Sequence, residues 1–332
     1  VDKGVTLTRP LIMRLSFYCV LEVGIEDPDE PKDPETPHFI PAYSQKVKAS
    51  KEFQTFQFDH SFVLNSLKSS MEGYVFHNQP LDTDDLLEQT VKLFNSCKTS
   101  LELFDMLHNM RAYDDSTYAH SLNVALICRR IGKWLKVDAA TLDTLTLCGL
   151  LHDIGKLKIP DEILNKPGKY TDEEFDLVKR HTKFGYELLK TLNIDPHIKK
   201  AALLHHERCD GSGYPLKATQ KDLDDFSMVV AIADVYDAMT AARSYRAPLC
   251  PFQVIERFEQ EGLQKYKPKF ILTFLQHIAS TYQNNRVLLS NGQSANIVML
   301  NQQHLARPIV QLNDNSCIDL STRLDLHIQS IL

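Results

Sequence analysis

The sequence lacks the features of membrane-spanning, exported or disulfide-stabilised proteins. It contains no apolar run of the about 18 residues that a membrane helix needs, and its N-terminus has no basic segment followed by an apolar one. Its seven cysteines are odd in number, scattered and never arranged as Cys-x-x-Cys. We therefore expect no membrane span, no disulfide framework, no structural zinc site and a cytoplasmic location.

The chain also lacks an excess of positive charge. Its formal net charge is −6 and its isoelectric point is near 6.1, which argues against binding of polymeric nucleic acid, although a local basic pocket could still bind a small phosphate ligand. With 332 residues, 43% of them hydrophobic, the chain can bury a full core. We expect one main domain with smaller appendages.

Composition divides the chain into three regions. Residues 1–100 form a mixed accessory region with an acidic, proline-rich linker near 27–37, and from Phe53 the apolar residues recur at helical spacing, with Asp84 or Asp85 as a possible cap. Residues 101–284 form the central helical domain. Residues 285–332 predict a small strand-rich segment, with strands at 286–289, 295–300 and 309–312 separated by asparagine-rich turns.

Metal-capable side chains recur through the central domain, with one or two in each expected helix. They are His120, His152, Asp153, His181, His205, His206 and Asp234. A lone histidine on an apolar helix face is more often structural, but so many buried titratable groups without a metal would carry a heavy desolvation cost. Convergence in a helical bundle therefore predicts a metal site, and the number of ligands suits two ions better than one.

Helix signals place these side chains. We expect a first helix over about 117–135 and a second from the Asp138 cap to His152-Asp153, with Gly155 as its stop. A third begins at a Thr171/Glu174 capping box and runs through His181 to Leu188. A fourth runs from Asp195-Pro196 to His205-His206-Glu207, and a fifth covers 226–242 around Asp234. Asp153 is the candidate bridge between two metals, since its two oxygens accept independently.

Other residues could bind substrate. Lys156 could neutralise a phosphate or be an ordinary surface lysine at a helix end. Arg243 and Arg246 could bind phosphate or cap their helix. The loop at 208–215 places glycines, Tyr214 and Pro215 directly after the histidine pair, which favours a substrate-reading loop over a plain turn.

Taken together, these segments resemble the HD-GYP domain family. The resemblance rests on His152-Asp153-x-Gly155-Lys156, on His205-His206-Glu207-x-x-Asp210-Gly211-x-Gly213-Tyr214-Pro215 and on Ala233-Asp234-x-Tyr236-Asp237-Ala238-Met239-Thr240, and it covers about residues 100–260. It implies a mainly α fold, a helical bundle holding a two- or three-metal centre that hydrolyses cyclic di-GMP to pGpG and then GMP. Some members of the family prefer mixed cyclic GMP-AMP, and some bind nucleotide with little turnover.

The resemblance also implies residue roles. One metal would be held by His120, His152, Asp153 and Asp234, and the second by Asp153, His181, His205 and His206. Trinuclear members carry a glutamate four residues before the first histidine, where this chain has Ser116; we therefore expect two ions, iron or manganese, with zinc, cobalt or nickel as alternatives.

In the implied reaction, a metal-bridged hydroxide attacks phosphorus while Lys156 stabilises charge on the phosphoryl oxygens. Tyr214, flanked by Gly213 and Pro215, and the pair Arg243 and Arg246 are expected to contact guanine or phosphate. Asp210 and Asp237 are candidates for the leaving-group acid or for orienting a histidine.

Two other functions stay open from the sequence. The chain could be a non-hydrolytic sensor whose Gly-Tyr-Pro loop binds a nucleotide or a protein partner, or a phosphohydrolase of the wider HD superfamily acting on another nucleotide. A homodimer is also left open. A substrate panel distinguishes these functions directly.

Overall fold

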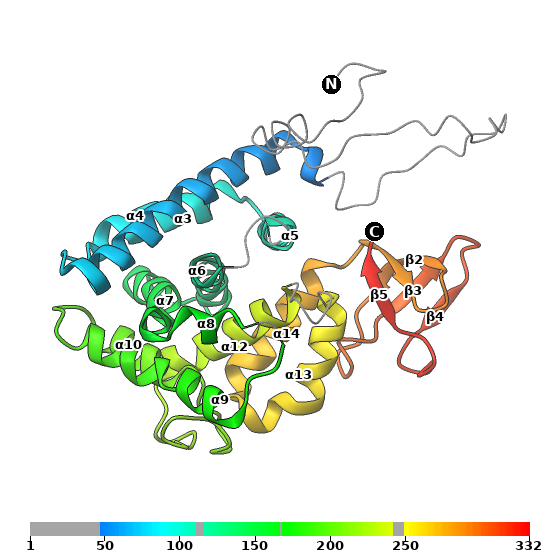
Figure 1. Cartoon of the computed structure of the whole chain (residues 1–332). Helices are drawn as coiled ribbons and strands as arrows, with labels where there is room; N and C mark the ends of the chain where they lie inside the picture. The colour runs from blue at the N-terminus through cyan, green and yellow to red at the C-terminus, as the bar shows by residue number, and fades with distance from the viewer. Residues whose placement is uncertain (1–46, 111–115, 167, 242–248) are drawn as a thin grey trace, which may run out of the picture. The chain divides into compact units, whose positions relative to one another are not determined.

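The computed structural model describes residues 47–110, 116–166, 168–241 and 249–332 (Figure 1). In these residues the chain is mainly α-helical and ends in a small antiparallel sheet, which confirms the expected fold class. The helices are α3 (Lys51–His77), α4 (Thr83–Ser96), α5 (Ser100–Met110), α6 (Thr117–Trp134), α7 (Ala139–Leu151), the 3₁₀ helix η1 (Ile154–Lys158), α8 (Asp161–Leu164), α9 (Asp172–Lys179), α10 (His181–Leu189), α11 (Pro196–Leu204), α12 (Asp225–Thr240), α13 (Pro251–Lys265) and α14 (Pro268–Thr281).

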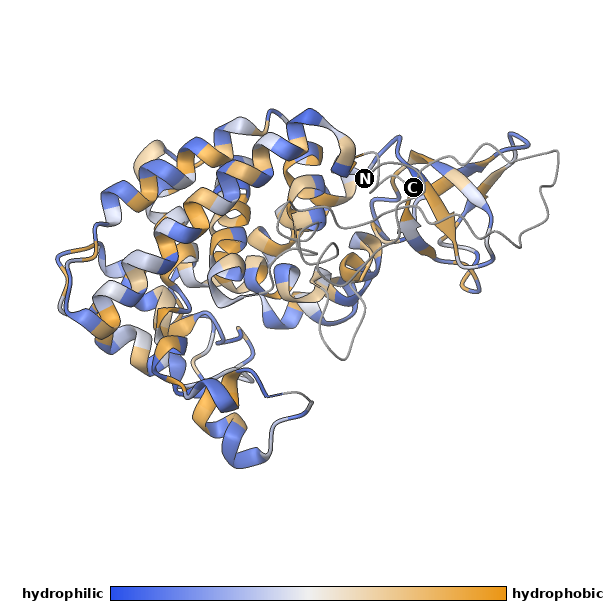
Figure 2. Cartoon of the chain, turned by 45° about the horizontal axis from the view of Figure 1, so that its top comes forward, coloured by the Kyte–Doolittle hydropathy of each residue, from blue (hydrophilic) through white to orange (hydrophobic). Residues whose placement is uncertain are grey.

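Helix α6 is the centre of the bundle. It packs against α7 and α12 and also contacts α3, α4 and α14, and Figure 1 shows it between α3 and α12. Every residue from Ser121 to Gly132 is buried, as expected for a helix covered on all sides. Apolar residues lie on the sides of the helices that face one another (Figure 2). The first turn of α6, which carries His120, is thereby fixed against its neighbours.

The helices before residue 101 pack onto this core. Helix α3 buries Phe53, Phe56 and Leu67, and the hydroxyl of Tyr74 donates to the carbonyl of Leu188 at 2.5 Å. The expected cap of α4 at Asp84 or Asp85 is wrong. Asp82 is the N-cap, because its side chain accepts hydrogen bonds from the backbone N–H groups of both later aspartates. The division of the chain at residue 100 stays a prediction.

Several helices end earlier than expected, each next to a candidate ligand. Helix α7 ends at Leu151, so His152 is its C-cap and Gly155 lies inside η1 instead of stopping α7. The helix expected from Thr171 to Leu188 is divided at Arg180 into α9 and α10, although the Thr171/Glu174 capping box is confirmed. Helix α11 ends at Leu204, before the His205-His206 pair.

Hydrogen bonds from three histidine rings accompany these early ends. The Nδ1 atoms of His152, His181 and His205 lie 2.7, 2.6 and 2.9 Å from the carbonyl oxygens of Gly149, Val178 and Ala201. The last carbonyls of a helix lack intrahelical partners, and an imidazole N–H just beyond the helix can satisfy one of them. The helix ends therefore orient the histidine rings.

The C-terminal segment forms one antiparallel sheet in the order β4-β3-β2-β1-β5. Its strands are β1 (Arg286–Leu289), β2 (Ser294–Met299), β3 (Ile309–Leu312), β4 (Cys317–Asp319) and β5 (Ile328–Ile331). The first three match the expected strands to within one residue, whereas β4 and β5 were not expected as strands. Arg307 connects the sheet to α13 through an ion pair with Glu256 at 2.7 Å.

None of the described helices has a stretch long and apolar enough to cross a bilayer.

Candidate metal centre

Side chains from four helical segments meet in the core of the bundle. His120 comes from α6, His152 and Asp153 from the end of α7, His181 from the start of α10, and the histidine pair from the end of α11. Ligand atoms of two sets each lie within 4.8 Å of one another: Asp153, His181, His205 and His206 form one set, and His120, His152 and Asp153 form the other. Asp153 belongs to both sets.

The carboxylate of Asp153 faces the two sets with different oxygens. Its Oδ2 lies 3.3 Å from Nε2 of His152 and 3.6 Å from Nε2 of His120. Its Oδ1 lies 3.3 Å from Nε2 of His181 and 3.7 Å from Nε2 of His205. Each oxygen therefore has its own pair of imidazole nitrogens, the arrangement that a carboxylate bridging two cations requires.

Asp234 of α12 lies beside both sets. Its Oδ1 is 3.1 Å from Nε2 of His120, and its Oδ2 is 3.7 Å from Nδ1 of His206. Three residues further on, the Oδ2 of Asp237 lies 2.7 Å from Nδ1 of His120. The spacing of three puts both carboxylates on one helix face, so that Asp234 approaches the inward nitrogen of His120 and Asp237 holds the outward one.

The donor set fits divalent metal ions. In His152, His181 and His205 Nδ1 lies within hydrogen-bond distance of a backbone carbonyl oxygen, which fixes that nitrogen as the donor and leaves the Nε2 lone pair toward the centre. Among the described residues, Nε2 of His152 and Oδ1 of Asp153 are buried and have no hydrogen-bond partner. Unsatisfied acceptors aimed at one point, on imidazoles and a carboxylate, are what a cation would satisfy.

Electrostatics keep Asp153 ionised. Burial by itself would raise its pKa, but the positive charge of Lys156 and the neighbouring His152 hold the pKa well below its ordinary value. The Lys156 ammonium donates to Oδ2 at 2.5 Å. Likewise, burial would lower the pKa of His120, but hydrogen bonds to Asp234 and Asp237 raise it to about 9.

We expect the metal-free protein to lose stability as the pH falls from about 6.5 toward 3. Burial lowers the pKa of His181 from 6.5 to about 3, so in this interval the unfolded chain binds a proton that the folded chain does not. Each pH unit there costs about 1.4 kcal/mol for one such histidine. His120 adds no slope, because its raised pKa means that it is protonated in both states below 6.5.

Urea unfolding of chelator-treated protein across this pH range measures the effect. His181→Gln should give a plot of unfolding free energy against pH that is shallower by about that 1.4 kcal/mol per unit. Identical slopes for the two proteins would contradict the expectation.

A cleft of about 760 Å³ opens onto this centre, a volume in the range of small-molecule sites. Lys156, His120, His181, His206 and Asp234 lie on its surface. Its walls come from α3, the start of α6, η1, α8, α9, α12 and the loop after α11. The proposed reaction centre is therefore accessible to a ligand of nucleotide size.

The Gly-Tyr-Pro loop presents its aromatic ring to this cleft. The ring centroids of Tyr214 and His206 are 4.6 Å apart, and of the three motif residues only Tyr214 lines the cleft. Gly213 is buried against the chain: a Cβ there would lie 2.4 Å from Cα of Glu207 and 2.5 Å from the carbonyl oxygen of His206. A side chain at this position would push the loop off the histidine pair.

Glu207 holds the other side of the loop. Its buried carboxylate accepts hydrogen bonds from the backbone N–H groups of Leu216 at 2.5 Å and Ala218 at 3.0 Å. Asp210 accepts from the backbone N–H and hydroxyl of Ser212 and does not line the cleft, so its place in the structure is that of a turn former. Arg243 and Arg246 lie outside the described residues.

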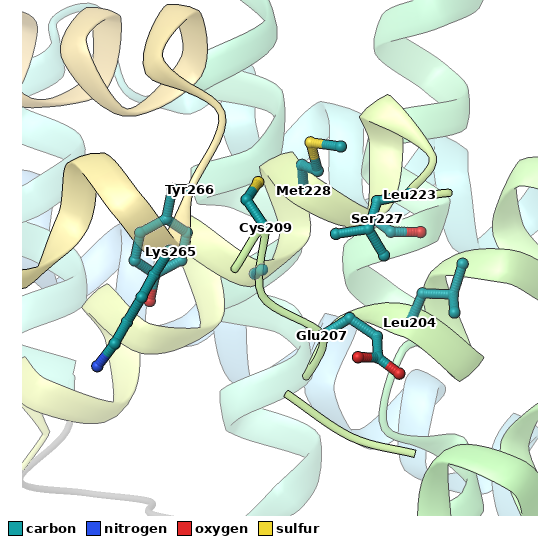
Figure 3. Close-up of a pocket in the computed structure, with 9 residues that line it drawn as sticks. Leu204, Glu207, Cys209, Leu223, Ser227, Met228, Lys265 and Tyr266 are labelled. Atoms are coloured by element: carbon teal, nitrogen blue, oxygen red, sulfur yellow. The ribbon is translucent and has the colours of Figure 1, made fainter. Parts of the chain in front are cut away.

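A second cavity lies behind Glu207, between α11, α12 and the end of α13 (Figure 3). Cys209, Ser227, Lys265 and Tyr266 are among its lining residues. Its volume of about 10 Å³ leaves room for at most a water molecule. It is a packing gap under the loop and offers no second ligand site.

Several cleft residues were not singled out from the sequence, among them Arg208, Tyr118 and Glu72. Arg208 lies on the cleft and donates to the carbonyl oxygens of His205 and Glu207; its place next to the histidine pair was an available signal. Tyr118 lies two residues before His120. Glu72 comes from α3, far from every motif, and no sequence signal indicated it.

Comparison with known proteins now identifies the chain. The model of the HD domain family matches residues 85–270, so the chain belongs to the HD-domain family. Its curated relatives, together with the His152-Asp153 and Gly213-Tyr214-Pro215 motifs, place it more narrowly in the HD-GYP group of that family. A solved structure of an HDG"Y"P protein from Bdellovibrio bacteriovorus has a similar fold, with a TM-score of 0.54, 19% identity and coverage of 69% of this chain and 76% of that one.

Three curated relatives indicate the range of activities in the group. A cyclic di-GMP phosphodiesterase of Pseudomonas aeruginosa is 33% identical over 62% of this chain and 50% of its own length. A cyclic di-GMP phosphodiesterase of Thermotoga maritima is 35% identical over 53% and 48%. The 3′3′-cGAMP-specific phosphodiesterase 2 of Vibrio cholerae is 34% identical over 54% and 35%. The chain thus spans half or less of the length of these relatives.

Proposed function

We propose that this chain hydrolyses the phosphodiester bonds of a cyclic dinucleotide, cyclic di-GMP in the first place, at a centre of two divalent metal ions, iron or manganese. The observation that carries the proposal is the Asp153 carboxylate, whose two oxygens face two separate pairs of imidazole nitrogens at 3.3–3.7 Å. The names of the relatives support the substrate class.

The ligands divide between two ions. His120, His152, Asp153 and Asp234 would hold one, and Asp153, His181, His205 and His206 the other. Divalent ions in this position would supply Lewis acidity toward the phosphoryl group. Asp237 keeps the His120 ring in the required orientation through the 2.7 Å contact with Nδ1; this contact favours an orienting role for Asp237 over that of leaving-group acid.

Two cleft residues act on the substrate itself in this proposal. The ammonium of Lys156, 22% exposed and on the cleft surface, faces the phosphoryl oxygens and stabilises the negative charge that gathers on them. The phenyl ring of Tyr214 offers a stacking surface for a base, with Gly213 and Pro215 fixing its position. Arg243 and Arg246 stay predicted phosphate contacts.

Product analysis tests the proposal. Protein loaded with Fe²⁺ or Mn²⁺ is incubated with cyclic di-GMP or 3′3′-cGAMP, and linear products are separated by chromatography. We expect metal-dependent formation of pGpG or GMP, faster with cyclic di-GMP. Tight nucleotide binding by fully loaded protein, without product, would contradict hydrolysis and favour the sensor function.

Removal of one positive charge gives a sharper test. Lys156→Met should lower kcat by about 10²-fold, since it removes a preorganised donor from the site where charge develops, while metal content is kept. Lys183, exposed on α10 and absent from the cleft lining, is the matched control. A kcat of Lys156→Met equal to that of Lys183→Met would refute the assigned role.

Three further expectations stay predictions: a cytoplasmic location, a protein partner at the Gly-Tyr-Pro loop and a homodimer. The six cysteines in the described residues are free thiols.

A further inference from the structure

The cleft has a wall that lies outside the matched HD domain. Glu72 and Phe76 of α3 line it, and Tyr118 from the first turn of α6, which lies within the matched domain, lines the cleft as well. The family match begins at residue 85, after the end of α3 at His77. This side of the cleft therefore lies outside the residues that the family match covers, and the HD-GYP motifs quoted above do not include it.

Glu72 presents a carboxylate with unused acceptor capacity. Its Oε1 accepts a hydrogen bond from the hydroxyl of Tyr118 at 2.9 Å. Within the described ranges, its Oε2 has no hydrogen-bond or ion-pair partner. Burial and the adjacent carboxylate raise the pKa of Tyr118, so the phenol stays a donor that orients Glu72. A carboxylate offers about four lone-pair sites, and one of them is used here.

Phe76 places an aromatic ring beside this acceptor. It follows Glu72 by four residues, which puts both side chains on one face of α3. The ring is 56% exposed, although it lines the cleft and does not belong to the core. The ammonium nitrogen Nζ of Lys158 lies over this ring, 5.7 Å from the ring centroid. An exposed ring on a cleft wall is a stacking surface for a nucleobase, in an arrangement common in proteins that bind unpaired bases.

On the basis of the proposed function, we infer that Glu72 and Phe76 form a guanine-binding wall. The phenyl ring stacks on the base, and the carboxylate accepts hydrogen bonds from guanine N1–H and from the exocyclic amino group at C2. Adenine presents one donor and one acceptor on the same edge, and its N1 lone pair would face the negative carboxylate. The wall therefore favours guanine by attraction and rejects adenine by repulsion.

The test compares guanine and adenine substrates. For wild type and Glu72→Gln, loaded with the same metal, kcat/KM is measured for cyclic di-GMP and cyclic di-AMP, and Kd for both nucleotides by calorimetry. We expect the guanine-to-adenine ratio to fall about tenfold or more, the size of one good bidentate base contact. Tyr118→Phe should lower the ratio less. Glu52→Gln, on the exposed first turn of α3, is the matched control and should keep the wild-type ratio.

The outcomes separate this inference from the proposed function. An unchanged ratio in an active Glu72→Gln protein overturns the guanine wall and leaves the phosphodiesterase intact. Loss of a metal ion per chain in that variant also overturns it, because Glu72 would then be a ligand that replaces the glutamate absent at Ser116. If loaded wild type hydrolyses neither nucleotide, the phosphodiesterase fails, and the Kd ratio alone decides on Glu72.

Discussion

Asp153→Asn should abolish hydrolysis and lower the bound metal from two ions per chain to one or fewer. The amide keeps a single acceptor oxygen, so it cannot face both pairs of histidines at once. It also removes the charge that Lys156 neutralises, which leaves an unpaired ammonium at the centre. Substitution of a residue that hydrogen-bonds to a metal ligand typically lowers metal affinity or activity about 10–100-fold. Loss of a ligand shared by two ions should therefore lower kcat by more than about 10³-fold.

Metal analysis of the purified protein and product formation measure both effects. Asp176→Asn provides the control, because Asp176 is an exposed residue of α9 whose ion pair with Lys179 lies on the surface. Two ions per chain in Asp153→Asn would show that the carboxylate is not shared between two sites. Full activity with one ion would show that hydrolysis needs only one.

Gly155→Ala should displace the histidines of the second metal site, His181, His205 and His206, although Gly155 is not itself a proposed ligand. A Cβ there would lie 2.0 Å from the carbonyl oxygen of His181 and 2.4 Å from the backbone nitrogen of Gly185. Both are backbone atoms of α10, so no side chain can turn away to make room. Helix α10 must shift, and His181 shifts with it. We expect a loss of about 1–3 kcal/mol in the free energy of unfolding and loss of the ion held by His181, His205 and His206.

Gly262→Ala is the matched control for this variant. Gly262 is also buried in a helix, but the nearest atoms to an added Cβ are side-chain carbons at 3.5 Å or more, an ordinary van der Waals distance. Alanine has the higher helix propensity, so this variant should equal or exceed wild-type stability by up to about 1 kcal/mol. Urea unfolding and metal content decide; a Gly155→Ala protein with wild-type stability and full metal would contradict the close contact.

The ligand-bearing segments could be predicted from the sequence because caps and helical periodicity are local signals. The capping box at Thr171 and the caps at Asp138 and Asp195 begin helices where they were expected. The helix ends could not be predicted in the same way. Nothing in the periodicity shows that the rings of His152 and His205 bond the preceding carbonyls, an effect that depends on where the rings are held by the rest of the core.

The site could be predicted only as far as its motifs extend. Asp237 was a candidate from the sequence, and its spacing of three from Asp234 contained the signal for a shared helix face. Tyr118 and Glu72 form their contact across 46 residues. A pair of this kind depends on how α3 packs against α6, which no local pattern encodes, so the α3 side of the cleft was missed altogether.

Helix α3 runs from a surface with exposed aromatic rings to the wall of the cleft. It is one continuous helix of 27 residues, about 40 Å long at 1.5 Å per residue. Phe58 and Phe62 expose their rings in the first half of the helix, and Glu72 and Phe76 line the cleft from its last two turns. Because one face of α3 is buried in the bundle from Phe53 to Met71, the helix is anchored along its length, and the cleft wall can shift only together with the core.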